Sequence, residues 1–128
     1  MAVNFPTRLQ SGGWVDMQPS EVSITSQTGG TVSFEDGVYN AMQGVAIIRI
    51  GVTPSSVTQK SSLANIKMGE VDALVTIRGQ TPSKTIGNGS SSSAIAISTL
   101  ISSTSKIRTR TLGIEASSSI SSTVIVYL

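Results

Sequence analysis

The sequence contains no cysteine and no histidine. Without cysteine the chain forms no disulfide and carries no thiolate, so cysteine usage says nothing about its redox compartment. Nucleophilic catalysis would have to rely on serine and lysine, which are sequence neighbours at 60–61, 83–84 and 105–106 only because serine is abundant. We therefore expect a protein that is not an enzyme and that needs no metal or cofactor.

Aromatic residues make up 4% of the chain and charged residues 12%. Because aromatic side chains bury the most area per residue, the core must instead be filled by valine, isoleucine, leucine and alanine. The 23 serines and 14 threonines give a surface that is polar but carries few charges. Such a surface suits a subunit that neighbouring molecules contact, although extracellular β-domains share this composition. The composition thus predicts that copies of the chain or other proteins complete its burial.

The 128 residues are enough for one domain, which would bury roughly two-thirds of the surface that the unfolded chain exposes. The first eight residues, M-A-V-N-F-P-T-R, do not combine a basic segment with an apolar one. We therefore expect no secretory signal and synthesis in a host cytoplasm. No apolar run reaches the length of a membrane span, so we expect no contact with a membrane. The net charge of +2 is too small to indicate nucleic-acid binding by itself.

The densest apolar run is V-A-I-I-R-I-G-V, from Val45 to Val52, and Arg49 is its single charge. Its β-branched residues favour a strand, and neither face of such a strand suits water. We predict that this run is the central strand and that layers of structure cover both of its faces.

About eight short strands separated by turn residues predict an all-β fold, either a single-domain β-sandwich or a barrel. The clearest two-sided strand is 70–78, which places four apolar residues on one face: Val71, Ala73, Val75 and Ile77. Residues 106–114 and 121–128 also have strand character, and Asp36-Gly37 predicts a hairpin turn. Residues 94–101 fit either a helix or a buried strand, and the spacing of their β-branched residues favours the strand.

Two segments interrupt this pattern. Residues 1–19 have no clear period and contain Pro6, Gly12, Gly13 and Pro19, so we predict an extended N-terminal arm ahead of a domain at 20–128. Residues 79–93 contain Pro82 and the run G-N-G-S-S-S-S, which predicts a flexible loop.

Three basic residues, Lys106, Arg108 and Arg110, alternate with β-branched ones. In a strand their side chains project from one face about 7 Å apart, which is close to the spacing of successive phosphates. They could therefore follow a nucleic-acid backbone or an acidic partner surface. The favoured alternative is that they protect an edge strand against unwanted pairing, because no aromatic residues are interleaved to stack bases.

Glu70 and Asp72 also share one strand face. Together with Glu35 or Asp36 they could form a divalent-cation site or an acid–base pair. No D-x-D-x-D-G loop accompanies them, so a solvated sheet edge is the favoured interpretation.

Phe5 and Trp14 are candidate partner-binding residues, because they would let the arm dock on a neighbouring subunit. Trp14, which follows two glycines, could instead stack on a carbohydrate or cover one end of the core. The sequence leaves all three interpretations of Trp14 open: docking on a subunit, stacking on a carbohydrate and covering the core.

The absence of cysteine and histidine, the few charges, the abundant Ser, Thr and Gly, the arm-like start and the final strand S-S-T-V-I-V-Y-L form a combined pattern. The chain in this respect resembles the small structural proteins of tailed-phage virions, including head decoration (cement) proteins. The resemblance is compositional and covers the whole chain.

This resemblance implies a β-sandwich or barrel that oligomerises, often as a trimer, and clamps neighbouring subunits of a capsid or tail. Its location would be the virion, and its partners would be copies of itself and other virion proteins. The alternatives are a major coat or tail-tube subunit, including an RNA-binding coat protein, and a carbohydrate- or receptor-binding β-module.

Overall fold

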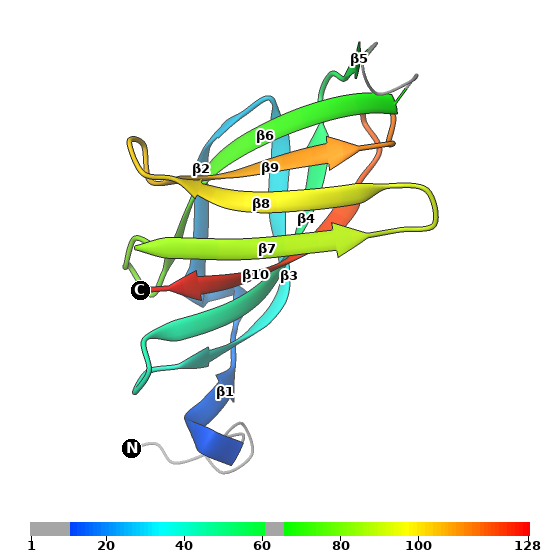
Figure 1. Cartoon of the computed structure of the whole chain (residues 1–128). Coiled ribbons are helices and arrows are strands. Elements are labelled where there is room, and N and C mark those ends of the chain that lie inside the picture. Colours follow the sequence, from blue (N-terminus) through cyan, green and yellow to red (C-terminus); the bar gives the residue numbers. More distant parts are fainter. Residues whose placement is uncertain (1–10, 61–65) are drawn as a thin grey trace.

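The computed structural model describes residues 11–60 and 66–128, which form one antiparallel sheet that curls into a half-barrel (Figure 1). The order of the strands across the sheet is β1-β3-β4-β10-β7-β8-β9-β6-β2, and β5 pairs with β6. The prediction of an all-β, single-domain fold is confirmed, with ten strands instead of about eight. The strands are β1 (Trp14–Asp16), β2 (Val22–Thr28), β3 (Gly30–Asn40), β4 (Val45–Pro54), β5 (Thr58–Lys60), β6 (Ile66–Ile77), β7 (Lys84–Ser90), β8 (Ile95–Ile101), β9 (Lys106–Leu112) and β10 (Ile120–Tyr127).

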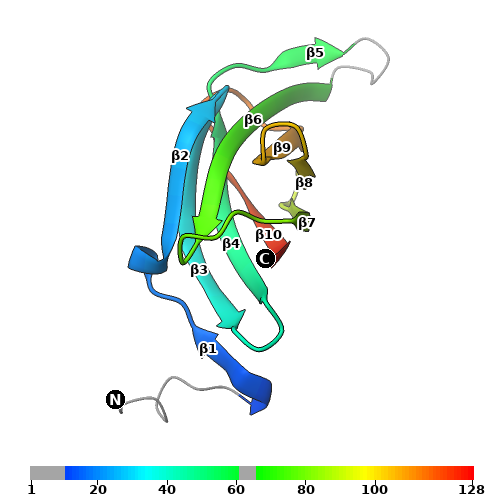
Figure 2. The same cartoon turned by 90° about the vertical axis from the view of Figure 1, so that its left-hand side faces the viewer.

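The core fills the concave face of the curled sheet. In Figure 2 the strands β3 and β4 face β6 to β9 across the interior. Inward positions of β4 and β10 supply Ile48, Ile50 and Val124, all of which are buried. The predicted apolar face of residues 70–78 is confirmed, because each of its four residues is buried in the same core: Val71, Ala73, Val75 and Ile77.

The Val45–Val52 run forms most of β4, which lies between β3 and β10 in the interior of the sheet. Its inward residues are buried, whereas Ile47 on the other face is only partly buried and Arg49 is exposed. The run is therefore an interior strand, but it is third of the nine in the sheet order, and β7 takes the middle position that was predicted for it. The prediction of a layer over both faces is wrong for the described residues. Curling covers the concave face alone, and the described residues form no second layer over the convex outer face.

The predicted loop at 79–93 is wrong for Lys84–Ser90, which form β7 between β10 and β8. The two glycines that suggested flexibility, Gly87 and Gly89, point toward the concave face. A Cβ atom on Gly87 would lie 2.8 Å from the carbonyl oxygen of Thr123, and one on Gly89 would collide with that of Ser121. The glycines are therefore needed because neighbouring backbone approaches β7 closely.

Small polar side chains fill the concave side of this part of the sheet. The buried Ser98 hydroxyl on β8 lies 2.8 Å from the Thr109 hydroxyl on β9 and 2.8 Å from the Ser122 hydroxyl on β10. Buried hydroxyls are usually hydrogen-bonded, because an unpaired one loses its bonds to water without replacement. Ser98 thus links strands on both sides of the glycine positions.

The predicted hairpin turn at Asp36-Gly37 is wrong, because both residues lie inside β3. A bulge between Phe34 and Asp36 shifts the register with β4. Gly37 is required at this point because a Cβ atom there would lie 2.8 Å from the carbonyl oxygen of Ile47. The turn before β3 is instead made at Gly29, whose φ is 81°.

The free edge of β3 is partly closed by the chain itself. The backbone N–H of Val32 donates to Oε1 of Gln27 at 2.8 Å, and the backbone N–H of Met17 donates to the carbonyl oxygen of Gly37 at 2.9 Å. These bonds occupy groups that would otherwise be open to an incoming strand.

Candidate functional site

The basic residues of β9 form an ion-pair ladder with carboxylates of β6. Nε and Nη2 of Arg108 donate to the two carboxylate oxygens of Asp72, each at 3.0 Å, and Nε of Arg110 donates to Glu70 at 2.9 Å. The register of the two strands causes this, since Arg108 stands opposite Asp72 and Arg110 opposite Glu70. The hydrogen bond to Asp72 raises the pKa of Arg108 above its ordinary value.

The ladder changes the interpretation of both charged motifs. Strand β9 lies between β8 and β6, so the prediction that its basic residues protect a sheet edge is wrong. Lys106 begins β9, and Arg108 and Arg110 already have carboxylate partners. Two of the three basic residues are therefore neutralised, so β9 does not present an open track of positive charge.

The acidic residues are held apart in two groups on the outer face. Glu35 and Asp36 pair with Arg49 at 3.1 and 3.0 Å, whereas Glu70 and Asp72 lie on β6, with five strands between β3 and β6 in the sheet order. The structure thus does not bring the four predicted carboxylates together. The described residues contain no group of three or more His, Cys, Asp or Glu side chains that could hold a metal ion.

Trp14 opens β1 and stands opposite Asn40 at the end of β3. It is partly buried, and the buried Asn40 side chain fixes the nearby backbone by donating to the carbonyl oxygen of Gly12 at 2.8 Å. Strand β1 lies at the opposite side of the strand order from β9, so Trp14 and the basic residues are not one site. Phe5 lies outside the described residues.

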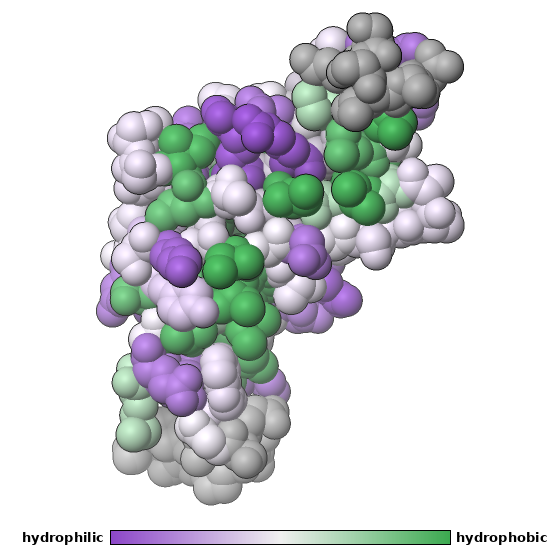
Figure 3. All heavy atoms as spheres, in the orientation of Figure 1, coloured by the Kyte–Doolittle hydropathy of each residue, from purple (hydrophilic) through white to green (hydrophobic). Residues whose placement is uncertain are grey.

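The most extensive feature of the outer face is a set of aliphatic side chains, which we name the aliphatic band. Four of its members are paired in a row across β3, β4, β10 and β7. Two further members lie on β8, and one of these is paired with a member on β9, which is paired in turn with a member on β6. Figure 3 looks onto this face, where hydrophobic residues gather between groups of hydrophilic ones. The band consists of Val38, Ile47, Ile125, Ile86, Ile97, Ile95, Leu112 and Met68.

Three members of the band are strongly exposed: Ile86 is 50% exposed, Ile97 49% and Ile95 44%. The sequence predicted a buried strand at 94–101, and the strand is confirmed at Ile95–Ile101, but only one of its faces is buried. The alternation of small and large residues along this strand is the sequence pattern that matches the two faces. The small residues Ala96 and Ser98 are buried, and the large residues Ile95 and Ile97 point outward. The usual placement of large apolar residues is reversed on β8.

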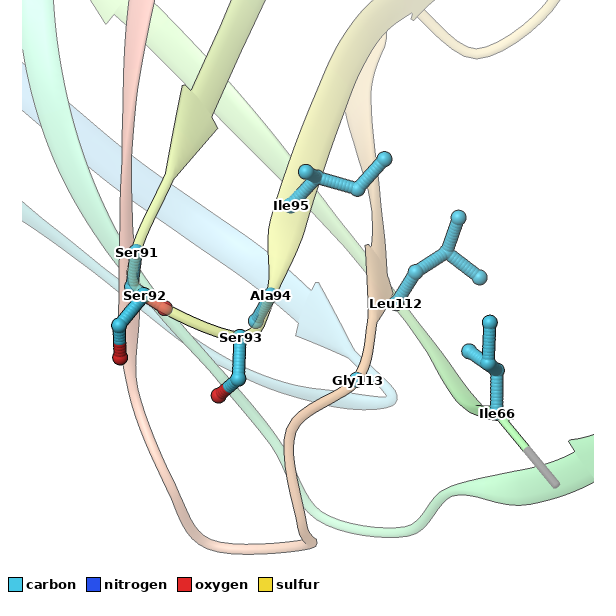
Figure 4. A pocket seen from close by; sticks show the side chains of 8 residues that line it. All are labelled: Ile66, Ser91, Ser92, Ser93, Ala94, Ile95, Leu112 and Gly113. Atoms are coloured by element: carbon cyan, nitrogen blue, oxygen red, sulfur yellow. The ribbon is translucent and has the colours of Figure 1, made fainter.

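At one end of the band lies a shallow groove of about 370 Å³. In Figure 4 the side chains of Ile95, Leu112 and Ile66 extend toward one side from β8, β9 and β6. The loop Ser91–Ser93 forms the adjacent wall. The groove is mainly apolar, and it contains no titratable group that would support acid–base chemistry.

None of the helices in the described part of the chain is long and apolar enough to cross a membrane. Comparison with known proteins finds no matching family model, no matching curated protein and no matching solved structure.

Proposed function

We propose that this protein is a non-enzymatic structural subunit of a virus or phage particle, of the decoration type, that stabilises a capsid or tail through contacts between subunits. Its place of action is then the virion, and its partners are copies of itself and other virion proteins. The aliphatic band is the observation that carries the proposal.

An antiparallel sheet that faces water normally places polar residues on its exposed side. Here the exposed side of the interior strands β7 and β8 carries Ile86, Ile95 and Ile97 instead. A continuous exposed aliphatic surface of this kind is typical of a protein contact. It also supplies the burial that a chain with 4% aromatic residues lacks within its own core.

Charged residues lie on both sides of the band, as in the rim of a protein interface. On one side Arg49 pairs with Asp36, and on the other Arg110 pairs with Glu70. Because these cations already have carboxylate partners, the face favours a protein partner over the phosphates of RNA. The alternative of an RNA-binding coat subunit is therefore less favoured, and no observation singles out the carbohydrate-binding alternative.

The test is the assembly state of the purified chain, measured by size-exclusion chromatography with light scattering and by electron microscopy. Replacing Ile86 and Ile97 together by threonine keeps β-branched residues in the strands but removes aliphatic surface. We expect this variant to associate at least about tenfold more weakly than the unchanged protein.

The matched control replaces Asn88 by Thr and Thr99 by Ser, on the same two strands and the same face but outside the band. We expect the control to assemble like the unchanged protein. A folded chain that stays monomeric at high concentration, alone and with particles, would overturn the proposed function, as would unchanged assembly of the isoleucine variant.

A further inference from the structure

The groove at the end of the aliphatic band presents apolar side chains that the described residues do not cover. Ile66 is 41% and Ile95 44% exposed, and Leu112 is partly buried beside them. The neighbouring loop Ser91–Ser93 places hydroxyl and backbone groups along one wall. A narrow apolar floor with a hydrogen-bonding wall suits an extended peptide with apolar side chains on one side.

The chain contains one segment outside the described residues with such a pattern. Residues 1–10 read M-A-V-N-F-P-T-R-L-Q, so Val3, Phe5 and Leu9 recur at even spacing with polar residues or proline between them. In an extended conformation these three side chains project from the same side. The segment therefore matches the chemistry of the groove.

The length of this segment decides which molecule it can reach. The described chain begins at Ser11, beside the Asn40 end of β3. Phe5 is six residues ahead of Ser11, which is roughly 20 Å at full extension.

The groove lies at the other end of the strands. Strand pairing aligns Asn40 with Lys84, at the start of β7, whereas Ser90 at its end is aligned with Leu112. The length of β7 alone is roughly 20 Å, and β3 and β9 lie on different parts of the curled sheet, which adds to this separation. Both views place β1 at the opposite end of the molecule from β5, which pairs with β6 near the groove (Figures 1 and 2). Phe5 is therefore too close to Ser11 in the sequence to reach the groove of its own molecule.

We propose that residues 1–10 of a second copy of this chain occupy the groove, with Phe5 on the apolar floor formed by Ile66, Ile95 and Leu112. This inference rests on the proposed function, since it names the contact through which copies associate. Ser11, from which the donating segment extends, and the accepting groove lie at opposite ends of the molecule, so the contact is head-to-tail. Such a contact produces a ring where the rotation closes and an open chain where it does not.

The absence of cysteine allows a direct test by engineered crosslinking. One variant carries Phe5→Cys, a second carries Ile95→Cys, and the two are mixed and oxidised at a concentration at which the unchanged protein assembles. We expect a disulfide-linked pair. The matched control combines Phe5→Cys with Thr99→Cys, an exposed outward position on the same strand but outside the groove, and should crosslink at least about tenfold less.

A chain carrying both Phe5→Cys and Ile95→Cys should form a ladder of linked oligomers. Closure of the bond within one molecule would overturn the inference, and so would equal crosslinking at Thr99→Cys. Circular dichroism of each reduced variant checks that the sheet is intact.

Deletion of residues 1–10 separates this inference from the proposed function. We expect the shortened chain to remain folded and to associate at least about tenfold more weakly. If it assembles normally while the Ile86/Ile97 threonine variant does not, the inference is wrong and the proposed function stands. If the full-length chain never assembles, both are wrong.

Discussion

Strands β4 and β8 are built from similar alternating residues but place their bulk on opposite faces. On β4 the large side chains of Ile48 and Ile50 are buried in the concave core. On β8 the concave positions carry Ala96 and Ser98, and the isoleucines Ile95 and Ile97 are exposed on the outer face.

The difference follows from how closely the neighbouring strands approach on the concave side. Gly87 and Gly89 of β7 let the backbone of β10 come near, and Ser98 of β8 then bonds to Ser122 of β10. At Ala96 and Ser98 the concave side accommodates only small side chains. One part of the sheet therefore buries its apolar residues within the chain, and the other leaves them exposed on the outer face.

The largest expected effect comes from the same truncation on the two strands. Ile48→Ala should lower the free energy of unfolding by about 2–5 kcal/mol, because it leaves a cavity in a fully buried site. Ile97→Ala should change it by about 0.5 kcal/mol or less. Urea unfolding of both variants measures the difference, and equal losses would show that the outer face is not independent of the core.

The next effect tests the close approach at β7. Gly89→Ala should destabilise the fold by about 2–3 kcal/mol, since its new Cβ atom would collide with the carbonyl oxygen of Ser121. Ser90→Ala, at an exposed outward position on the same strand, is the control and should be nearly neutral. Thermal unfolding of the two variants provides the measurement, and a neutral Gly89→Ala would contradict this explanation of the glycine.

A smaller effect is expected from the buried hydroxyls. Ser98→Ala removes a partner from both Thr109 and Ser122 and should cost about 1–2 kcal/mol. Adding Thr109→Val should cost less than the sum of the two single changes, because both act on the same hydrogen bond. The exposed Ser102→Ala is the reference, and a loss at that position as large as at Ser98 would count against a hydroxyl cluster.

The smallest effect concerns the ion-pair ladder. A double-mutant cycle that replaces Arg108 and Asp72 by alanine should give a small favourable coupling that decreases in high salt. The exposed pair of Lys67 and Glu115, 2.7 Å apart, should give a coupling near zero. Equal couplings would mean that the two hydrogen bonds between Arg108 and Asp72 add nothing to a simple charge contact.

The sequence predicted the fold where a strand has a strong period of its own. The alternation at 70–78 identified the buried face of β6, and the apolar run at Val45–Val52 identified β4. The predicted turn at Gly37 and the predicted loop around Gly87 and Gly89 were wrong, because the role of these glycines depends on strands that are distant in the sequence. Gly37 accommodates β4 inside a long strand, and Gly87 and Gly89 accommodate β10, whereas local rules assign these residues to turns and loops.

The candidate site was only partly predictable for a similar reason. The charged residues of β6 and β9 were each recognised, but their pairing depends on which strands are neighbours and on the register between them. The aliphatic band is formed by residues from seven strands, and no local pattern indicates that Ile47, Ile125 and Ile86 lie side by side. The outward orientation of Ile97 follows from the lack of space on the opposite face of β8.

The hydrogen bond from the Val32 backbone N–H to the Gln27 side chain limits the pairing of a strand from another molecule with β3. A side-chain amide occupies a backbone group where a foreign strand would begin to add, so lateral growth in the cross-β manner is obstructed at the very start of β3. The outer face can therefore stay apolar while this part of the sheet edge remains closed to an added strand.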